Sequence, residues 1–540
     1  MLILSKNNNK PACTATPAKR CFARVPLILI AALLLIGGRV AAQELRVGLA
    51  TITSSPDPHF YDIGPNSAAR QHIYEALFRR TADLRFEPLL AESAAPENDT
   101  TWVIKLRRDV RFTDGSALTA ADVIATLTRL PLIKGSPSSY APYITFVSSV
   151  AARDEHTVVV TTKGPYPNLP QYFAAIGIIP KSVAERGNDV RFDDPANAIG
   201  TGPYRFAEFV PSDRFVITRN EAYRGGREPW SRVTFRQFPS TPTRTAALLA
   251  GDLDIIDQAN VADIARLQDA PNTTIAKGPS IFVLFLQPFQ GPDAIPGVRG
   301  KGTENPLADR RVREALSLAI DREAIVARVI EGLGAPASQL VVPGFFGFND
   351  KIPTVRPDLV RARALLAEAG YEQGFELLLS SPKGRYMNDD RVAQAVAQML
   401  TRVGIKATVE AMPVSTLFAR RNKSELALFL GGFGTNTGES LFALQAMVGT
   451  RNEATGMGRI NFSKYGNPAI DALISSAATD MGTETRGASL REAMRLAVAQ
   501  DFATIPLHQE FNIWGLRKGI RFEPRMDADT LAMSARPAQP

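Results

Sequence analysis

The order of apolar and polar residues between positions 375 and 440 predicts a repeating strand and helix pattern. "FELLLS", "IKATVEA" and "ELALFLGG" are short apolar or alternating runs, which are typical of strands. Between the first two runs, apolar side chains recur at helical spacing and Gly404 ends the pattern. "PVSTLFARRNKS" can form a second, shorter helix. Strand, helix, strand, helix, strand predicts parallel strands joined by right-handed crossovers.

Two polar loops follow strands of this predicted unit, namely "SPKGRYMND" and "GFGTNTGES". A third polar loop follows "ELRVGLA" near the start of the chain. Parallel strands end at one edge of their sheet, and ligands tend to bind outside the carboxyl ends of such strands. The three loops therefore predict a ligand cleft between two lobes.

Other segments predict an α/β protein throughout. "SAARQHIYEALFRR" reads as one helix with Ile73, Leu77 and Phe78 on a common face. "LTAADVIATLTRL" begins with Thr119 and Asp122 at capping-box spacing. "NAIGTGPYRFAEF" and "RFVITRN" predict a hairpin, and "ADRRVREALSLAIDREAIVARVIEGLG" predicts one or two helices that end at glycine.

Length and composition fit a globular protein of two or three domains. The chain has 540 residues, of which 45% are hydrophobic and 21% charged. This length is sufficient for a stable core without covalent cross-links.

The N-terminus predicts a secretory signal peptide over residues 1–42. Basic residues precede an apolar run from Val25 to Ile36, and Val40-Ala41-Ala42 fits a cleavage site with Gln43 as the mature start. The run is shorter than the roughly 20 residues of a membrane span, which leaves an uncleaved anchor as the alternative. We therefore expect a periplasmic location.

Removal of this segment changes the charge and the cysteine count. Residues 1–42 hold six of the 62 Lys and Arg residues and none of the 54 acidic residues, so the mature chain has a net charge of +2. A nucleic-acid partner is therefore not expected. Cys13 and Cys21 are also in this segment, which excludes disulfides, thiolate metal sites and a cysteine nucleophile in the mature chain.

No catalytic or metal motif stands out. The four histidines lack metal-site spacing, and "SSPK" matches only one of three motifs of a serine acylase. "GDLDIIDQ" clusters Asp252, Asp254 and Asp257 without the glycine and glutamate of a calcium loop. We expect no metal and no cofactor. A pair of catalytic carboxylates set by the fold stays possible at this point.

Several segments carry a resemblance to a known family. "TWVIKLRRDVRFTDGSALTAADV" resembles the W-x-F-x-L-R-x-x-V-x-F-x-D-G-x-x-x-T-A-x-D-V signature of family 5 extracellular solute-binding proteins, with Ile104 at the first phenylalanine. "GTGPYRF", "AGDLDII", "LLAEAGYEQGFEL" and "IPLHQEFNIWGLRKGI" resemble further blocks of the family, in its order. These proteins are the dipeptide and oligopeptide receptors of ABC importers.

The resemblance implies a two-lobed periplasmic-binding-protein fold with a subdomain inserted in the first lobe. The implied first lobe is 43–85, 198–280 and 505–540, the inserted subdomain is 86–197, and the second lobe is 281–504. The implied partners are a small ligand, which could be a peptide, a modified peptide, an opine or sugar-like, and a membrane permease. We expect a monomer that binds and releases its ligand without chemistry.

The resemblance also implies ligand-binding residues. In dipeptide-type members an arginine before the "A-Q-x-x-x-L" helix meets the ligand carboxylate, and Arg385 has this position. An aspartate after a tryptophan meets the ligand ammonium, but this chain has Phe433 and Asn436 at those positions. Because Asn carries no charge, this position favours a ligand without a free amine. The other candidates are Thr435, Thr437, Ser54, Ser55 and Tyr204.

Two other functions remain open from the sequence alone. A secreted hydrolase with unrecognised carboxylates would turn substrates over. A receptor that feeds a sensor partner would bind the same kind of ligand without importing it.

Overall fold

The computed structural model describes residues 43–292, 294–299 and 304–538. The segment from Glu44 onward forms one compact unit. The predicted signal peptide, residues 1–42, lies outside the described residues. Among the described residues, no helix has the length and apolar character of a membrane span.

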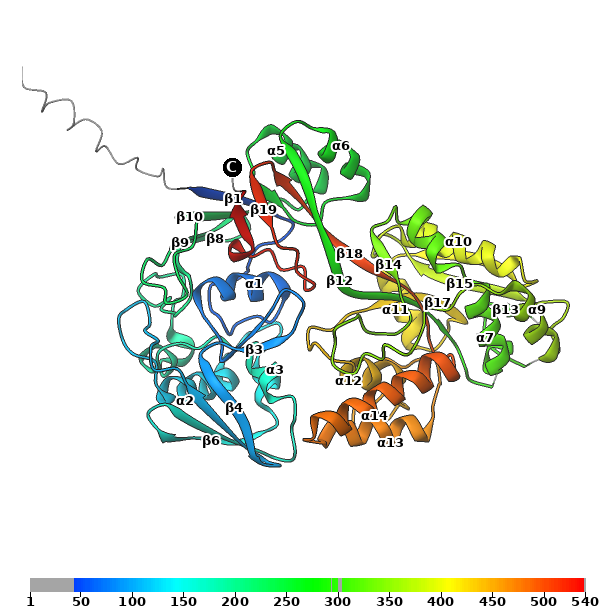
Figure 1. Ribbon diagram of the computed structural model, residues 1–540, viewed down its shortest axis with the longest axis horizontal. Coiled ribbons are helices and arrows are strands. Elements are labelled where there is room, and N and C mark those ends of the chain that lie inside the picture. Colours follow the sequence, from blue (N-terminus) through cyan, green and yellow to red (C-terminus); the bar gives the residue numbers. More distant parts are fainter. Residues whose placement is uncertain (1–42, 293, 300–303, 539–540) are drawn as a thin grey trace, which may run out of the picture. The chain divides into compact units, whose positions relative to one another are not determined.

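One mixed sheet contains twelve strands of the described chain, drawn in Figure 1. These strands are β1 (Glu44–Leu49), β8 (Tyr204–Val210), β9 (Arg214–Arg219), β10 (Arg232–Gln237), β11 (Ile255–Ile256), β12 (Thr273–Pro288), β13 (Val298–Arg299), β14 (Gly334–Pro336), β15 (Glu376–Pro382), β16 (Lys406–Met412), β17 (Leu428–Phe433) and β18 (Ile505–Arg517). Its main path runs β13-β15-β17-β12-β18-β11-β1-β10-β9-β8.

Smaller sheets and fourteen α-helices complete the described chain. The remaining strands are β2 (Phe78–Arg80), β3 (Phe86–Pro88), β4 (Ala91–Asn98), β5 (Thr101–Leu106), β6 (Val147–Asp154), β7 (Thr157–Thr162), β19 (Ile520–Phe522) and β20 (Ala535–Pro537). The helices are α1 (Gly64–Ile73), α2 (Ala120–Arg129), α3 (Leu169–Phe173), α4 (Lys181–Ala184), α5 (Thr241–Ala250), α6 (Ile264–Asp269), α7 (Arg310–Ala319), α8 (Arg322–Ala324), α9 (Leu359–Glu368), α10 (Asp389–Thr401), α11 (Val414–Asn422), α12 (Leu441–Ala443), α13 (Pro468–Thr479) and α14 (Thr483–Arg495).

The strand and helix repeat predicted between 375 and 440 is confirmed. β15 pairs in parallel with β16 on one side and with β17 on the other, and α10 and α11 form the crossovers. The apolar face of α10 is buried in a cluster with the apolar side chains of β15 and β17. Burial of this face stabilises the helix more than its intrinsic propensity does.

Two long antiparallel strands, β12 and β18, join the two ends of the large sheet. The first part of β12 pairs with the last part of β18, next to β11, and its last part also pairs with β17. Their pairing is interrupted between Pro279 and Val283 and again between Leu284 and Phe285. At the first interruption, Ile281 N–H donates to Met526 O at 3.1 Å in place of a bond to β18.

The four-stranded sheet β4-β5-β7-β6 is antiparallel and lies within residues 91–162. Trp102, Ile104 and Val158 are buried on one face, beneath α2. The capping box predicted for α2 is present, because the Asp122 carboxylate accepts the Thr119 backbone N–H at 2.8 Å. This sheet falls inside the span predicted as the inserted subdomain. The residue bounds predicted for the two lobes and for the subdomain stay a prediction.

The helix predicted over residues 67–80 ends earlier than expected. α1 ends at Ile73, and Phe78 begins β2, whose residue Phe78 pairs with Pro88 of β3. Leu77 and Phe78 pack in the core of the 91–178 region, not on the helix face with Ile73. Tertiary packing therefore overrides the helical spacing at the end of this segment.

The other local predictions agree with the structure. β8 and β9 form the expected antiparallel hairpin. The segment from 308 to 334 forms α7, α8 and a short π-helical turn, and Gly332 adopts a φ of +73° after it. A positive φ of this kind explains glycine at the end of the helical segment.

Candidate functional site

A cavity of about 440 Å³ lies where the loop after β17 meets segments from the first 180 residues and the C-terminus. Its volume is within the range of small-ligand sites. The side chains and backbone that line it are Asp62, Ile63, Gly64, Ser67, Arg80, Pro142, Tyr143, Gln171, Tyr172, Ala175, Gly434, Thr435, Asn436, Thr437, Phe442, Asp527 and Asp529. We call this space the central cavity.

The loop after β17 supplies one wall of the central cavity. The hydroxyls of Thr435 and Thr437 lie 2.9 Å apart, and Thr437 N–H donates to the Thr435 hydroxyl at 3.2 Å. Asn436 between them is exposed and lines the cavity. These short internal bonds hold three consecutive polar residues in a defined turn.

Aromatic stacking supports this wall. Phe442 lines the central cavity, and its ring stacks on Phe433 with centroids 5.9 Å apart. Phe433 in turn packs against the buried cluster beneath the loop. Phe433 therefore acts as support for the lining residue Phe442, an arrangement that the strand-end position alone does not specify.

Arg385 lies beside the end of β17, outside the lining of the central cavity. Its guanidinium lies over the rings of Tyr386 and Phe418, at 5.3 and 5.2 Å, and its Nε donates to the Tyr386 hydroxyl at 3.0 Å. The same hydroxyl contacts both the N–H and the carbonyl oxygen of Gly432. Arg385 itself is exposed.

The remaining sequence candidates are not brought to the cavity lining. Ser54 N–H and hydroxyl both donate to Asn66 Oδ1, at 3.1 and 3.3 Å. The Ser55 hydroxyl accepts the Asp57 N–H at 3.1 Å. Tyr204 is fully buried in the core around β8 and β10. Their proposed contact with a ligand stays a prediction.

The structure adds four charged residues that the sequence did not single out. Asp62 accepts a hydrogen bond from the Tyr143 hydroxyl at 2.7 Å. Asp529 accepts one from Gln71 Nε2, also at 2.7 Å. Asp527 pairs with Arg525 at 2.7 Å, and Arg80 donates to the Ser67 hydroxyl at 3.2 Å. The alternating charges of "RMDAD" were the only hint of this group, and they match no known motif.

Burial shifts the pKa values of two titratable groups that line the central cavity, Asp529 and Tyr143. Burial raises the pKa of Asp529 to about 7, and the nearby carboxylate of Asp527 adds to the shift. Burial, together with the Asp62 carboxylate, raises the pKa of the Tyr143 hydroxyl well above its ordinary value. The Tyr143 hydroxyl therefore keeps its proton and remains a donor to Asp62.

An ion pair at the end of the β17 loop bridges distant segments. Arg486 on α14 donates to Glu439 at 2.6 Å, and their side chains are 6% and 2% exposed. Asn168, just before α3, donates to Glu439 at 2.5 Å and accepts from Arg486 at 2.6 Å. The three side chains connect the loop that carries Thr435–Thr437 to α3 and α14.

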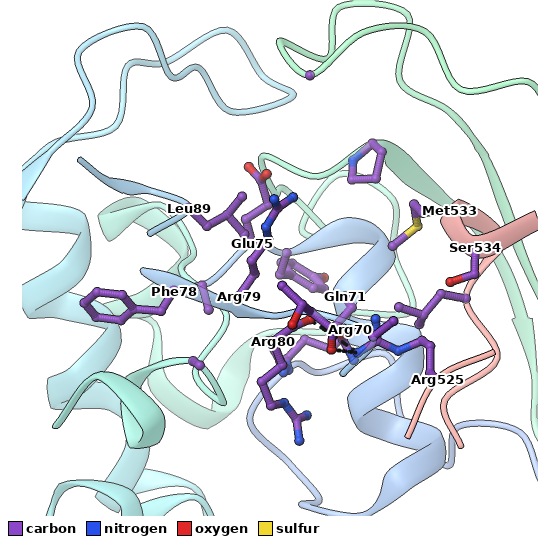
Figure 2. Close-up of a pocket in the computed structure, with 18 of the residues that line it drawn as sticks. Arg70, Gln71, Glu75, Phe78, Arg79, Arg80, Leu89, Arg525, Met533 and Ser534 are labelled. Carbon is purple, nitrogen blue, oxygen red and sulfur yellow. Dashed lines mark hydrogen bonds between the residues drawn. The ribbon is translucent and has the colours of Figure 1, made fainter. Parts of the chain in front are cut away.

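A second cavity has a volume of about 470 Å³, and Figure 2 shows residues that line it. Its lining includes five arginines, which are Arg70 of α1, Arg79 and Arg80 of β2, and Arg525 and Arg536 of the C-terminal segment. Arg525 pairs with Asp527, and Arg536 pairs with Glu228 at 2.7 Å. Arg80 lines both cavities.

No group of three or more metal-ligating side chains is found among the described residues. The central cavity presents hydroxyls, an amide, aromatic rings and a few charges, which are groups that bind and orient an organic molecule. Together with a mixed α/β fold built around two long shared strands, this geometry defines a solute-binding protein.

The chain belongs to the bacterial extracellular solute-binding proteins, family 5, whose profile matches residues 85–455. It is 27% identical over 493 residues to the glutathione-binding protein GsiB of Escherichia coli (strain K12), covering 88% of this chain and 91% of GsiB. The predicted two-lobed periplasmic-binding-protein fold is thereby confirmed, as is the family resemblance.

Two solved structures illustrate the likeness in fold. HbpA2 from Haemophilus parasuis superposes with a TM-score of 0.76 at 24% identity, over 92% of this chain and all of that one. The periplasmic binding protein DppA from Helicobacter pylori, in complex with the peptide STSA, has a TM-score of 0.67 at 19% identity, over 92% of this chain and 98% of DppA. GsiB and DppA are binding proteins.

Proposed function

We propose that this protein is the periplasmic receptor of an ABC importer and that it captures a peptide-like solute in the central cavity. The observation that carries the proposal is the lining of that cavity, which combines the loop after β17 with loops more than 250 residues away in the sequence. A ligand that contacts both sides would favour their approach, since only differential contact shifts a conformational equilibrium.

The ligand class follows from the size and chemistry of the cavity. A volume of about 440 Å³ suits a molecule of two or three amino-acid residues better than a long peptide. GsiB relatives named for glutathione and the DppA complex with a tetrapeptide support a peptide-like ligand. The delivery of that ligand to a membrane permease, by a monomeric receptor exported through the predicted signal peptide, is part of the proposal.

The loop residues have separate roles in this proposal. Thr435, Asn436 and Thr437 form hydrogen bonds to the ligand, while Phe433 supports the aromatic wall. Arg385, Ser54 and Ser55 contact the parts of a ligand that extend beyond the central cavity. Tyr204 is the weakest of these candidates, because its side chain is fully buried in the core.

Binding without turnover is also part of the proposal. A catalytic site would need a positioned acid, base or nucleophile next to the reacting atoms. The carboxylates of the central cavity are each engaged by a donor of the protein, through Tyr143, Gln71 and Arg525. Such groups are suited to hold a ligand in place.

A ligand screen with a blocked variant tests the proposal. The full chain is expressed with its own leader, recovered from the periplasm and screened by thermal shift against glutathione, other di- and tripeptides, and their N-acetylated forms. We expect at least one compound to raise the melting temperature and to be recovered unchanged by mass spectrometry. Asn436→Trp should remove the shift, whereas Asn422→Trp, an exposed position at the end of α11, should retain it. Turnover of a bound compound, or equal shifts for the two variants, would contradict the proposal.

A further inference from the structure

The charges of the central cavity are all on one wall. Asp62, Arg80, Asp527 and Asp529 come from the first 80 residues and from the C-terminal segment. The opposite wall, formed by the loop after β17, offers hydroxyls, one amide and the Phe442 ring. A charged group of the ligand would therefore interact with the wall that carries Asp62, Arg80, Asp527 and Asp529.

Two of the carboxylates on this wall have neutral hydrogen-bond donors and form no ion pair within the part of the chain that the structure describes. Asp529 is only 7% exposed and is bound by the amide of Gln71, and Asp62 is bound by the hydroxyl of Tyr143. Asp527, by contrast, is neutralised by Arg525. A carboxylate taken out of water without a cation is costly, so a cationic group of the ligand would stabilise it.

Arg80 presents the opposite case on the same wall. Among the described residues it forms no ion pair, and its side chain donates to the Ser67 hydroxyl at 3.2 Å. A guanidinium with a single neutral partner has donors left for a carboxylate, which it can bind through two parallel bonds.

One further polar atom of the cavity lacks a partner. Gln171 Oε1 is buried and has no hydrogen-bond partner among the residues that the structure describes, and Gln171 lines the central cavity close to Tyr172. A buried acceptor of this kind needs a donor, and a ligand ammonium or amide N–H would supply one. It is a neutral group, so it points to a ligand independently of the charges.

We infer that the ligand is a zwitterion whose ammonium group binds Asp529 and whose anionic group binds Arg80. The inference rests on the proposed function and names the residues that would determine its specificity. It differs from the sequence expectation, in which Arg385 meets the ligand carboxylate and the uncharged Asn436 favours a ligand without a free amine. The charge that is missing at Asn436 is supplied from across the cavity.

The ionisation of Asp529 agrees with this assignment. Its pKa of about 7 in the free protein reflects burial and the nearby Asp527, against the opposing effect of Arg80 and Arg525. A ligand cation would lower that pKa. Binding near neutral pH should therefore release a proton and should be tighter at pH 8 than at pH 6.

Paired compounds test the inference on the unaltered protein. Each peptide that binds in the screen is compared with its N-acetylated and its C-amidated form by calorimetry. We expect each modification to weaken binding at least tenfold and the unmodified peptide to release a proton in buffers of different ionisation enthalpy. Equal binding of the N-acetylated form would overturn the inference while the proposed function stands. Failure of every compound to bind would overturn both.

Two variants then locate the charges. Asp529→Asn should lower affinity for the free peptide at least tenfold and remove the proton release, without a further loss for the acetylated form. Arg80→Gln should lower affinity for the free peptide at least tenfold, without a further loss for the C-amidated form. Asp471→Asn is the matched control, since Asp471 also accepts one hydrogen bond, from Thr450 N–H, but lies outside the cavity. Unchanged affinity in Asp529→Asn would overturn the assignment.

Discussion

The buried ion pair between Arg486 and Glu439 gives the most direct test of how the β17 loop is held. Arg486→Met keeps the length and volume of the side chain but removes its charge. Glu439 would then lie buried, at 2% exposure, and the amide of Asn168 would be its one remaining side-chain donor among the described residues. The loss of one partner of such a pair costs about 3–5 kcal/mol, because a charge is left without compensation.

The cost should be concentrated in the segments that the pair connects. Hydrogen exchange measured by mass spectrometry follows the opening of α14 and of the loop 434–440 separately. A loss of about 3 kcal/mol corresponds to exchange more than about a hundredfold faster where local opening controls it. Arg495→Met on the same helix is the control. Its pair with Glu492 has side chains that are 43% and 45% exposed, so its removal should cost about 1 kcal/mol or less.

A double variant distinguishes charge from packing. Arg486→Met combined with Glu439→Gln removes both charges and should be more stable than Arg486→Met alone, since no buried ion remains. The reasoning is refuted if Arg486→Met perturbs exchange no more than Arg495→Met does. It is also refuted if the two single changes simply add.

Two further predictions concern Glu510 and Gly438. Burial raises the pKa of Glu510 to about 7 against an ordinary 4.5, so its contribution to stability is present below pH 4.5 and is lost as the pH rises through 7. Glu510→Gln should therefore be more stable than the natural protein at pH 8, by up to about 3 kcal/mol, and equally stable near pH 4.5. Urea unfolding at both pH values checks this. Glu376→Gln, at an exposed position, is the control. Gly438 has a φ of +67°, and a Cβ there would lie 2.5 Å from Leu84 O. Gly438→Ala should displace the β17 loop and weaken ligand binding at least tenfold in a calorimetric titration, and unchanged affinity would contradict it.

Local rules predicted the elements whose residues interact with near neighbours. The spacing of Thr119 and Asp122 marked the start of α2, and the apolar periods from 375 to 433 gave three parallel strands with their crossovers. The same rules failed at Leu77 and Phe78. Their helical spacing was real, but both side chains are buried in the core of the 91–178 region, and Phe78 pairs with β3 as the first residue of β2.

The residues of the candidate site also fall into those that are neighbours in the sequence and those that only the fold brings together. Thr435, Asn436 and Thr437 are consecutive and follow a predictable strand, so the sequence could indicate a polar loop at a sheet edge. Arg80 and Asp529 are about 450 positions apart, and no spacing relates them. Only the fold, which returns the C-terminal segment to α1, brings them to one cavity.

The interruption of the β12–β18 pairing has a mechanical consequence. Ser280 to Phe282 lie between Pro279 and Val283 of β12, the two residues at which pairing with β18 stops and resumes. Rotation of the strand at these three residues would therefore break few hydrogen bonds of the sheet. Ile281 N–H is attached instead to the carbonyl of Met526, one residue before Asp527. Rotation of the strand about this point would also move Asp527 and Asp529. Ligand binding by these carboxylates and rotation of the strand would then be coupled.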